Sequence, residues 1–537
     1  MKLKPRSLSF VTLCSLTWLA SACGEAPKTS NDTPPRVVDA APGAPAGEEV
    51  APAPAPPAED ESGSAQDEPS PGSPTPGTPA PSGTPPSSQT STLEQPTYVK
   101  EWVVSPTGND AASGTASAPL RTISRAITLA RPGHLIRVLA GTYAERLNFN
   151  GSVYAGTTTA PITLRGEGKP TLVPPSSGSG AQMILERPYW KISGLNIDLK
   201  GKAAYAVIFA ENVQGTVLSQ SEIHHAAYNA GVSFHRNANG GTLENNLIHH
   251  IWIAEGKDAH GVMVQPTAKN ITIRNNVIHT NSGDAIQCHS PDGSMPAEPA
   301  TNVLIEGNDL YGNYEQSLDI KTCYNLTVRR NRMHDNWTRG NGAMVVHMSA
   351  KNILIEENEF YNVGVGVGVG GNHYGPVPSG IVIRRNRFRD MRTDGGWSGG
   401  GLALENSDGT QVLNNTFTRL PGPAIKAGGG TGGATSNLVV KNNLVDVAQA
   451  LSVGSYAPGL KVDTNLYKSG ASFVRTGTKM DFTRWKSLGF DSRSLQGDAQ
   501  LNTSTLVPGP VAVDRGELLN LSYCGKAPDL GAVETGC

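Results

Sequence analysis

A short motif built around asparagine recurs through the second half of the chain, and it restricts the possible folds more than any other feature of the sequence. Each copy sets one Asn between two short apolar segments, as in Glu244-Asn245-Asn246-Leu247-Ile248 and Ile273-Arg274-Asn275-Asn276-Val277-Ile278. Further copies are centred on Asn308, Asn331, Asn358, Asn386, Asn415, Asn443 and Asn465, at spacings of 22 to 32 residues, with weaker copies at Leu195 and Ser221. Self-similarity at such a period indicates stacked structural repeats.

The repeats have the character of β-strands. Their apolar residues alternate with a period of two and they lack helix-forming stretches, so leucine-rich and helical repeats fit poorly. Variable spacing around a constant core suits strands that stack about 4.8 Å apart while the turns lengthen outward. Asn side chains stacked at one turn would bond one another and the turn backbone. The pattern therefore predicts an all-β parallel β-helix, a solenoid.

The N-terminal part has the composition of an export signal and a tether. Three basic residues lie within the first six, and an apolar run over residues 8–20 follows, too short to span a bilayer. Leu19-Ala20-Ser21-Ala22-Cys23 resembles a lipobox, which predicts a lipoprotein signal peptide over 1–22 and lipidation of Cys23. Gly24 then favours an outer-membrane lipoprotein at the cell surface or in the periplasm, with plain secretion as the alternative.

Residues 23–97 are rich in Pro, Ala and Ser, and residues 24–97 include no aromatic residue. Such a segment buries too little apolar surface to fold, so we expect a disordered linker that reaches on the order of 50 Å. Order is expected from 98 to 537. A helix is predicted over 122–130, because Ile123, Ala126, Ile127 and Ala130 share one face behind a Thr122 N-cap.

Two ends of the folded part resemble pectate-lyase-like β-helix proteins. The opening likeness lies in Val103-Val104-Ser105-Pro106-Thr107-Gly108-Asn109-Asp110, Pro119-Leu120-Arg121-Thr122-Ile123 and Ala140-Gly141-Thr142-Tyr143. The closing likeness lies in Phe482-Thr483-Arg484-Trp485, Gly489-Phe490-Asp491 and Ala527-Pro528-Asp529-Leu530-Gly531-Ala532-Val533-Glu534. The resemblance implies an all-β, right-handed parallel β-helix with an N-terminal capping helix, an N-cap over about 98–145 and a C-terminal module over about 468–537.

Alignment of the coils by their Asn residues, with a one-residue adjustment at some coils, places five polar residues at one outward strand position: His235, Gln265, His289, Lys321 and His347. The position two residues earlier holds Ser233, Met263, Gln287 and Asp319, while Ile286, Leu318 and Ile320 alternate inward. In the proteins that the chain resembles, the substrate lies along one such sheet. The resemblance therefore implies substrate-binding roles for His235, Gln265, Gln287 and Trp337.

The same resemblance implies β-elimination on a uronate-containing, pectate-like polysaccharide. Lys321 is the expected base, since desolvation and a nearby cation lower a lysine pKa. His289 or His347 would stabilise charge or serve the leaving oxygen. The expected cofactor is Ca²⁺, with Asp284, Glu315 and Asp319 as candidate ligands that bridge to the substrate carboxylate.

Other readings of these residues stay open. Asp319 and Lys321 also suit an ordinary solvated pair, and stacked histidines suit ordinary surface polarity. The aspartate cluster of family-nine pectate lyases is matched only in part. A non-catalytic glycan-binding or surface-adhesion protein is thus one alternative, and a glycoside hydrolase or uronate epimerase is another, although the sequence lacks the Asp-Asp, Gly-His-Gly and Asp-Pro-His signatures of such enzymes.

Charge and cysteine content set further bounds. A net charge of −2 gives no basic surface for nucleic acid, so the expected partners are an acidic polysaccharide and, through the lipid, the outer membrane. A monomer is expected. Outside the signal and Cys23, four cysteines remain: Cys288, Cys323, Cys524 and Cys537. The last two could close a C-terminal loop, and no cysteine spacing indicates zinc.

Overall fold

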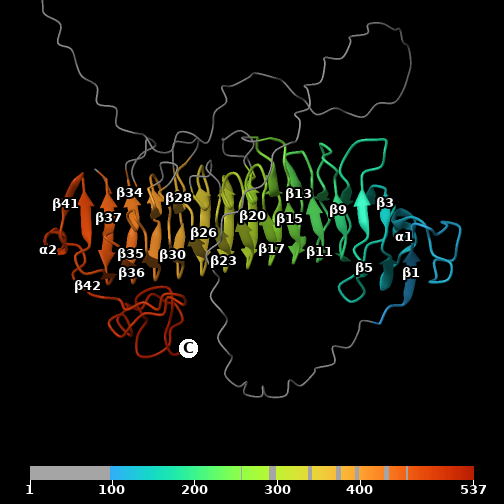
Figure 1. Cartoon of the computed structure of the whole chain (residues 1–537). Coiled ribbons are helices and arrows are strands. Elements are labelled where there is room, and N and C mark those ends of the chain that lie inside the picture. The colour runs from blue at the N-terminus through green and yellow to red at the C-terminus, as the bar shows by residue number, and fades with distance from the viewer. Residues whose placement is uncertain are drawn as a thin grey trace, which may run out of the picture. The chain divides into compact units, whose positions relative to one another are not determined.

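The computed structural model describes residues 97–537 except 255–256, 290–297, 337–341, 371–375, 394–397, 429–434 and 455–456. These residues form three 14-stranded sheets, in which nearly every pair of neighbouring strands is three strands apart in sequence. Each coil therefore gives one strand to each sheet, and the strands stack in order along the solenoid (Figure 1). This arrangement confirms the right-handed parallel β-helix. The predicted signal peptide, Cys23 and linker residues 23–96 lie outside the described residues.

Sheet 1 comprises β1 (Lys100–Val104), β2 (His134–Val138), β5 (Ile162–Gly166), β8 (Trp190–Ser193), β11 (Val217–Ser219), β14 (Thr242–Glu244), β17 (Lys269–Arg274), β20 (Ala300–Glu306), β23 (Cys323–Arg329), β26 (Lys351–Glu356), β29 (Val382–Arg384), β32 (Gln411–Leu413), β35 (Val439–Lys441) and β38 (Lys461–Asp463). Sheet 2 comprises β4 (Leu147–Phe149), β7 (Met183–Leu185), β10 (Val207–Phe209), β13 (Ala230–Phe234), β16 (His260–Val264), β19 (Ile286–Cys288), β22 (Leu318–Ile320), β25 (Met344–Val346), β28 (Val365–Val369), β31 (Gly400–Leu404), β34 (Ile425–Ala427), β37 (Gln449–Val453), β40 (Ser472–Arg475) and β41 (Thr478–Met480). Sheet 3 comprises β3 (Thr142–Ala144), β6 (Thr171–Val173), β9 (Asn196–Asp198), β12 (Glu222–His224), β15 (Leu247–His249), β18 (Val277–His279), β21 (Asp309–Tyr311), β24 (Arg332–His334), β27 (Glu359–Tyr361), β30 (Arg387–Arg389), β33 (Thr416–Thr418), β36 (Leu444–Asp446), β39 (Leu466–Tyr467) and β42 (Leu495–Gln496).

The repeated asparagines form a continuous buried ladder at the turn between sheets 1 and 3. Asn246 Nδ2 and the Asn246 backbone N–H both donate to Asn276 Oδ1 over 3.0 Å. Asn276 Nδ2 donates in addition to the Leu243 carbonyl of the coil below over 2.9 Å. The same bonds continue coil by coil to Asn465. The ladder confirms the Asn series, and it satisfies turn backbone groups that would otherwise be buried without partners.

A left-handed residue precedes each rung of this ladder. Its φ lies between 51° and 66° from Asn245 through Thr464. Asn and Gly tolerate that conformation better than other residues, which explains the Asn-Asn pairs in several copies of the motif. The motif thus specifies both the left-handed turn residue and the Asn that stacks on the next coil.

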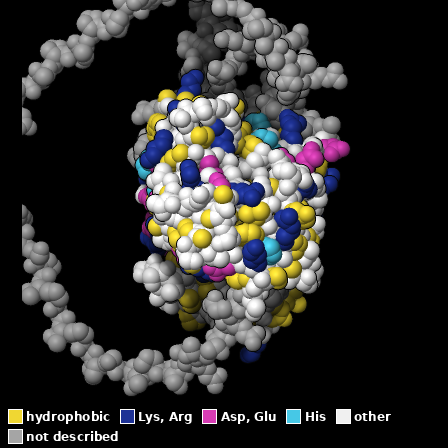
Figure 2. All heavy atoms as spheres, turned by 90° about the vertical axis from the view of Figure 1, so that its right-hand side faces the viewer, with side chains coloured by type: hydrophobic (Ala, Val, Ile, Leu, Met, Phe, Trp, Pro, Cys, Tyr) yellow, Lys and Arg dark blue, Asp and Glu magenta, His cyan; other side chains and the backbone are white. Residues whose placement is uncertain are grey.

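Helix α1 (Ile123–Leu129) caps the N-terminal end, as predicted. The Thr122 side chain accepts a hydrogen bond from the Arg125 N–H, and Ile123, Ala126 and Ile127 are buried. The Glu145 carboxylate accepts from the first two helical N–H groups. Seen from this end, hydrophobic side chains are scattered among polar and charged ones (Figure 2). The helix therefore covers the apolar end of the core.

The C-terminal module begins with the antiparallel strand β41 and helix α2 (Phe482–Lys486), and the segment beyond β42 returns along the coils. Asn414 Nδ2 donates to the Asp529 carbonyl over 3.1 Å, and the Ala532 N–H donates to Thr416 Oγ1 over 2.9 Å. Disulfides join Cys524 to Cys537 and Cys288 to Cys323. In the described part of the chain, neither helix has the length and apolar run that crossing a membrane requires.

Candidate active site on sheet 2

The register predicted for the polar column is confirmed by strand pairing on sheet 2. Ser233 pairs with Met263, Met263 with Gln287, and Gln287 with Asp319. Two residues later, the backbone ladder continues through the outer column, His235, Gln265, His289, Lys321 and His347, each donating its N–H to the coil before it. Ile286, Leu318 and Ile320 are fully buried in the core. Alignment of the coils by the Asn ladder therefore predicted the register of side chains on a different sheet correctly.

Asp319 and Lys321 are not a solvated surface pair. Their side chains are only 9% and 17% exposed, and Lys321 Nζ lies 3.7 Å from Asp319 Oδ2. Gln287, in the neighbouring coil, is 2% exposed. A charged group removed from water in this way requires specific partners.

Asp319 sits at the centre of the site, where it makes two side-chain hydrogen bonds in addition to the ion pair with Lys321. His347 Nε2 donates to Asp319 Oδ1 over 2.7 Å, and Gln287 Nε2 donates to Asp319 Oδ2 over 3.4 Å. Burial by itself raises the pKa of Asp319, but the charges of His347 and Lys321 and the His347 hydrogen bond outweigh burial and hold this pKa well below its usual range. The carboxylate is therefore ionised and favours the charged form of Lys321.

His289 is fixed in one tautomer by Gln287. Because Gln287 Nε2 faces the carboxylates of Asp284 and Asp319, Gln287 Oε1 faces His289 Nδ1 at 2.8 Å. An amide oxygen only accepts, so Nδ1 carries the proton and Nε2 keeps its lone pair. Burial and the neighbouring Lys321 charge lower the pKa of His289 to about 4. At neutral pH the column thus holds a neutral imidazole one coil from a charged ammonium.

The three carboxylates predicted to bind calcium have different surroundings. Asp284 is fully buried, with Oδ1 accepting from the Gln316 N–H over 2.9 Å and Oδ2 accepting from Gln287 over 3.1 Å. His260 Nδ1 also lies 3.2 Å from Asp284 Oδ2, and burial raises the Asp284 pKa. Glu315 lies half-buried in the turn before β22. Among the residues that the structure describes, these carboxylates do not come together as one ligand group.

The predicted substrate-binding residues continue the polar surface toward earlier coils. His235 Nδ1 lies 2.9 Å from Ser233 Oγ, and Gln265 Nε2 donates to the same oxygen over 3.2 Å. Sequence reasoning missed Tyr205, whose ring lies 5.2 Å from that of His235 and which bonds to Gln265. The coil of Tyr205 precedes the Asn series, so alignment by the Asn residues did not include it. Trp337 lies outside the described residues.

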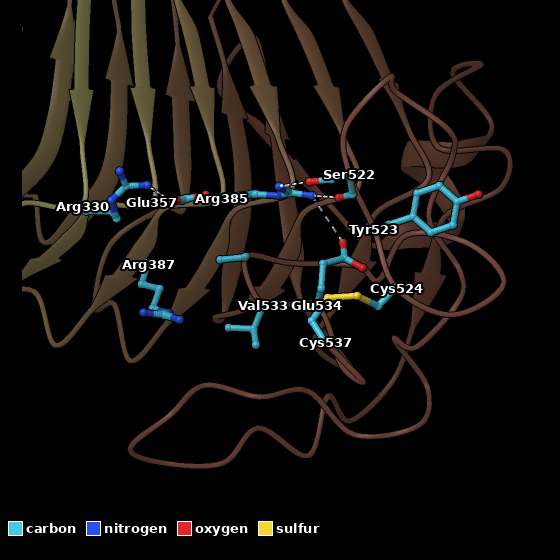
Figure 3. A pocket seen from close by; sticks show the side chains of 11 residues that line it. Arg330, Glu357, Arg385, Arg387, Ser522, Tyr523, Cys524, Val533, Glu534 and Cys537 are labelled. Atoms are coloured by element: carbon cyan, nitrogen blue, oxygen red, sulfur yellow. Dashed lines mark hydrogen bonds and ion pairs between the residues drawn. A yellow bond between two sulfur atoms is a disulfide. The ribbon is translucent and has the colours of Figure 1, made fainter. Parts of the chain in front are cut away.

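A cavity of about 440 Å³ lies elsewhere, where the C-terminal module meets sheets 1 and 3 (Figure 3). Arg330, Arg385 and Arg387 line it together with Glu534 and the Cys524–Cys537 disulfide. Arg385 donates to Ser522 and lies 4.0 Å from Glu534. None of the residues predicted for the site lines this cavity, and its contacts attach the module to the coils.

Solved structures that are similar to this chain include three polysaccharide lyases. Pectate lyase Pel9A is 17% identical, with a TM-score of 0.40 and coverage of 82% of this chain and 97% of that one. The PL6 family alginate lyase AlyGC is 18% identical, with a TM-score of 0.50 and coverage of 72% and 53%. A mannuronic acid specific family 6 lyase from human gut microbiota is 16% identical, with a TM-score of 0.47 and coverage of 73% and 90%. At 18% identity, the likeness to AlyGC shows the fold alone.

Family models match most of the solenoid, whereas no curated protein matches the sequence. A model described as right handed beta helix region matches residues 296–473. A second model, described as protein of unknown function (DUF1565), matches residues 106–380, which is about half of the chain and includes the whole polar column. The chain therefore belongs to the DUF1565 family.

Proposed function

We propose that this chain is a carbohydrate-active enzyme that cleaves a uronate-containing, pectate-like polysaccharide by β-elimination at the Asp319 cluster. The observation that carries the proposal is the pairing of a neutral His289 with a charged Lys321 in one column of sheet 2. A fold of this kind does not determine a reaction, so the proposal rests on these side chains. Elimination needs a base for the proton beside the uronate carboxylate and a cation that stabilises the resulting negative charge.

Lys321 is the cation in this scheme. Asp319, 3.7 Å away, favours the ammonium form, which would bind the substrate carboxylate and lower the cost of charge on it. The sequence predicted Lys321 as the base, and that role stays a prediction; the scheme proposed here makes Lys321 the cation because an ionised carboxylate beside a lysine favours its charged form. The geometry therefore supports an exchange of roles between Lys321 and His289.

His289 is the base in this scheme. Its Nε2 lone pair takes the C5 proton of the uronate, electrons move to form the C4–C5 double bond, and the C4–O bond breaks. The leaving oxygen takes a proton from water. Gln287 holds His289 through Nδ1, and the bound uronate raises the affinity of the ring for the proton. His235, Gln265 and Tyr205 would hold neighbouring sugars along the sheet.

The test is product formation from polygalacturonate and alginate, followed by the ultraviolet absorbance of unsaturated products. We expect absorbance with the wild type and its loss in His289→Ala and Lys321→Ala, with His250→Ala on sheet 3 as the matched control. Reducing ends without absorbance would indicate a hydrolase, and altered uronate stereochemistry without shortening would indicate an epimerase. Binding without any product would make the chain a glycan-binding protein, and each of these outcomes contradicts the proposal.

Calcium stays a prediction. Asp284 and Asp319 already bond to protein groups, so no step of the scheme passes through a metal. Assays with a chelator and with added Ca²⁺ test whether the reaction needs the ion. A rate that falls on chelation and recovers with Ca²⁺ would show that it does, and the carboxylates would then have to rearrange to bind the ion.

We further propose that the enzyme is exported and anchored in the outer membrane by lipid on Cys23, with acidic polysaccharide as its partner. Cys23→Ser would then move the protein from the membrane fraction to the soluble fraction. An unchanged distribution would contradict the anchor and leave the reaction untouched.

A further inference from the structure

A second cluster of titratable side chains lies on sheet 3, separate from the polar column of sheet 2. Asp198, His224, His249 and His279 occupy one register position on successive coils. The rings of His224 and His249 stack 5.1 Å apart, and those of His249 and His279 stack 5.3 Å apart. A second histidine, His225 or His250, follows directly in two of these coils. The region therefore concentrates imidazoles on one ridge of the solenoid.

Three ligand atoms converge between the first two of these coils. His224 Nδ1 lies 2.6 Å from His225 Nδ1 and 3.8 Å from Asp198 Oδ1, and His225 Nδ1 lies 3.4 Å from the same oxygen. Lys200 holds the other carboxylate oxygen, with Nζ 2.5 Å from Asp198 Oδ2. Within the described residues, this is the group of histidine and acidic side chains whose ligand atoms gather closely enough for one metal ion.

The hydrogen bonds behind the cluster direct a lone pair into it. His224 Nε2 lies 2.7 Å from Asn196 Oδ1, and Asn196 Nδ2 donates to Thr171 Oγ1 over 3.2 Å. Because the amide oxygen only accepts, His224 Nε2 carries the proton and His224 Nδ1 presents its lone pair to His225 and Asp198. Metal-bound histidines are oriented by such a bond from their second ring nitrogen.

The spacing of the three atoms fits one small cation. Ligands about 2.0–2.1 Å from a zinc ion are about 3.3 Å apart at tetrahedral angles. The observed separations of 2.6, 3.4 and 3.8 Å bracket that value. The shortest separation, between the two Nδ1 atoms, would have to widen for both nitrogens to bind one ion at tetrahedral angles.

We propose that Asp198, His224 and His225 bind a divalent transition-metal ion of the zinc type. Two imidazoles and one carboxylate are borderline ligands that suit Zn²⁺, whereas Ca²⁺ prefers oxygen ligands throughout. Three protein ligands leave a fourth position for water or for a group of a bound molecule. The site is independent of the elimination chemistry on sheet 2.

The next coil repeats half of the arrangement. His249 Nδ1 lies 2.6 Å from His250 Nδ1, and His249 Nε2 donates to Glu222 Oε1 over 3.1 Å. The His225 and His250 rings are 5.6 Å apart. Glu222 thus binds Nε2 of His249 as Asn196 binds Nε2 of His224. Among the described residues, however, no carboxylate joins His249 and His250 as a third ligand.

The site can be tested by isothermal calorimetry, in which Zn²⁺ is titrated into the untagged full chain after all metal has been removed. The absorbance spectrum of bound Co²⁺ then reports the coordination geometry. We expect one equivalent to bind with a tetrahedral Co²⁺ spectrum. His225→Ala and Asp198→Asn should weaken binding more than about tenfold, while His289→Ala on sheet 2 serves as the matched control and leaves it unchanged. The His225 side chain is 51% exposed, so its removal should preserve the fold, which circular dichroism verifies.

Three outcomes would overturn the proposal. The first is no saturable binding up to about 1 mM Zn²⁺, a Kd too weak for a built site. The second is binding that His225→Ala leaves intact. The third is loss of binding in His250→Ala but not in His225→Ala, which would place the ion on the next coil.

Discussion

Replacing Asn358 by alanine should destabilise the solenoid strongly, because this residue makes four buried hydrogen bonds in the middle of the Asn ladder. Its Nδ2 donates to the Val328 carbonyl over 2.9 Å and to Asn386 Oδ1 over 3.0 Å. Its Oδ1 accepts from the backbone N–H and from Nδ2 of Asn331, each over 3.0 Å. The side chain is fully buried, so water does not replace these partners.

The expected loss follows from those bonds. At about 1 kcal/mol for each hydrogen bond, the net loss is about 4 kcal/mol, and the stranded Asn331 N–H adds to it. Asn352→Gly is the matched control: Asn352 is exposed, makes one bond of 3.1 Å to Asn325, and has a φ of 57° that glycine accepts. That variant should lose less than about 1 kcal/mol.

Denaturant unfolding followed by circular dichroism measures the two losses. Because coils of a solenoid can unfold separately, hydrogen exchange at the Asn331 amide provides the local readout. Exchange there should accelerate greatly in Asn358→Ala and little in Asn352→Gly. Equal stability of the two variants would refute the view that the ladder holds the coils together.

Two further predictions concern the neighbourhood of His289. Burial of this neutral ring lowers its folded pKa to about 4 from 6.5, so the unfolded state binds more protons between these values and stability should fall as pH falls from about 6.5 toward 4. His289→Gln should flatten this part of a stability profile measured by denaturant unfolding, and an unchanged profile would contradict the assigned burial. The Cys288–Cys323 disulfide closes a separation of 35 residues, and its removal in Cys288→Ala with Cys323→Ala should cost about 4 kcal/mol under oxidising conditions. A loss below about 1 kcal/mol would mean that the coils alone define this region.

The repeats of the sequence predicted more of the fold than of the chemistry. The Asn repeats predicted the stack, and the alternation of residues within each strand then predicted the register of His289 and Lys321 and the inward side of Leu318. They did not predict that Gln287 and Asp319 would be buried on the outer face of sheet 2. Such burial depends on turn packing, which a strand pattern does not encode.

The roles proposed for the site residues rest on contacts that a sequence does not reveal. The proton on His289 Nδ1 follows from the orientation of the Gln287 amide, and the charge of Lys321 follows from its distance to Asp319. The ridge on sheet 3 had a visible signal in the His-His pairs one coil apart at His224 and His249. Its third ligand, Asp198, lies in a coil without an asparagine rung.

The pH dependence of kcat/KM for unsaturated-product formation tests the central claim most directly. With His289 as a neutral base, the rate should hold at neutral pH and fall as the pH drops through about 4, where the ring takes up a proton. A rate that instead rises through the alkaline range would make Lys321 the base. The absence of unsaturated product at every pH would contradict the elimination itself.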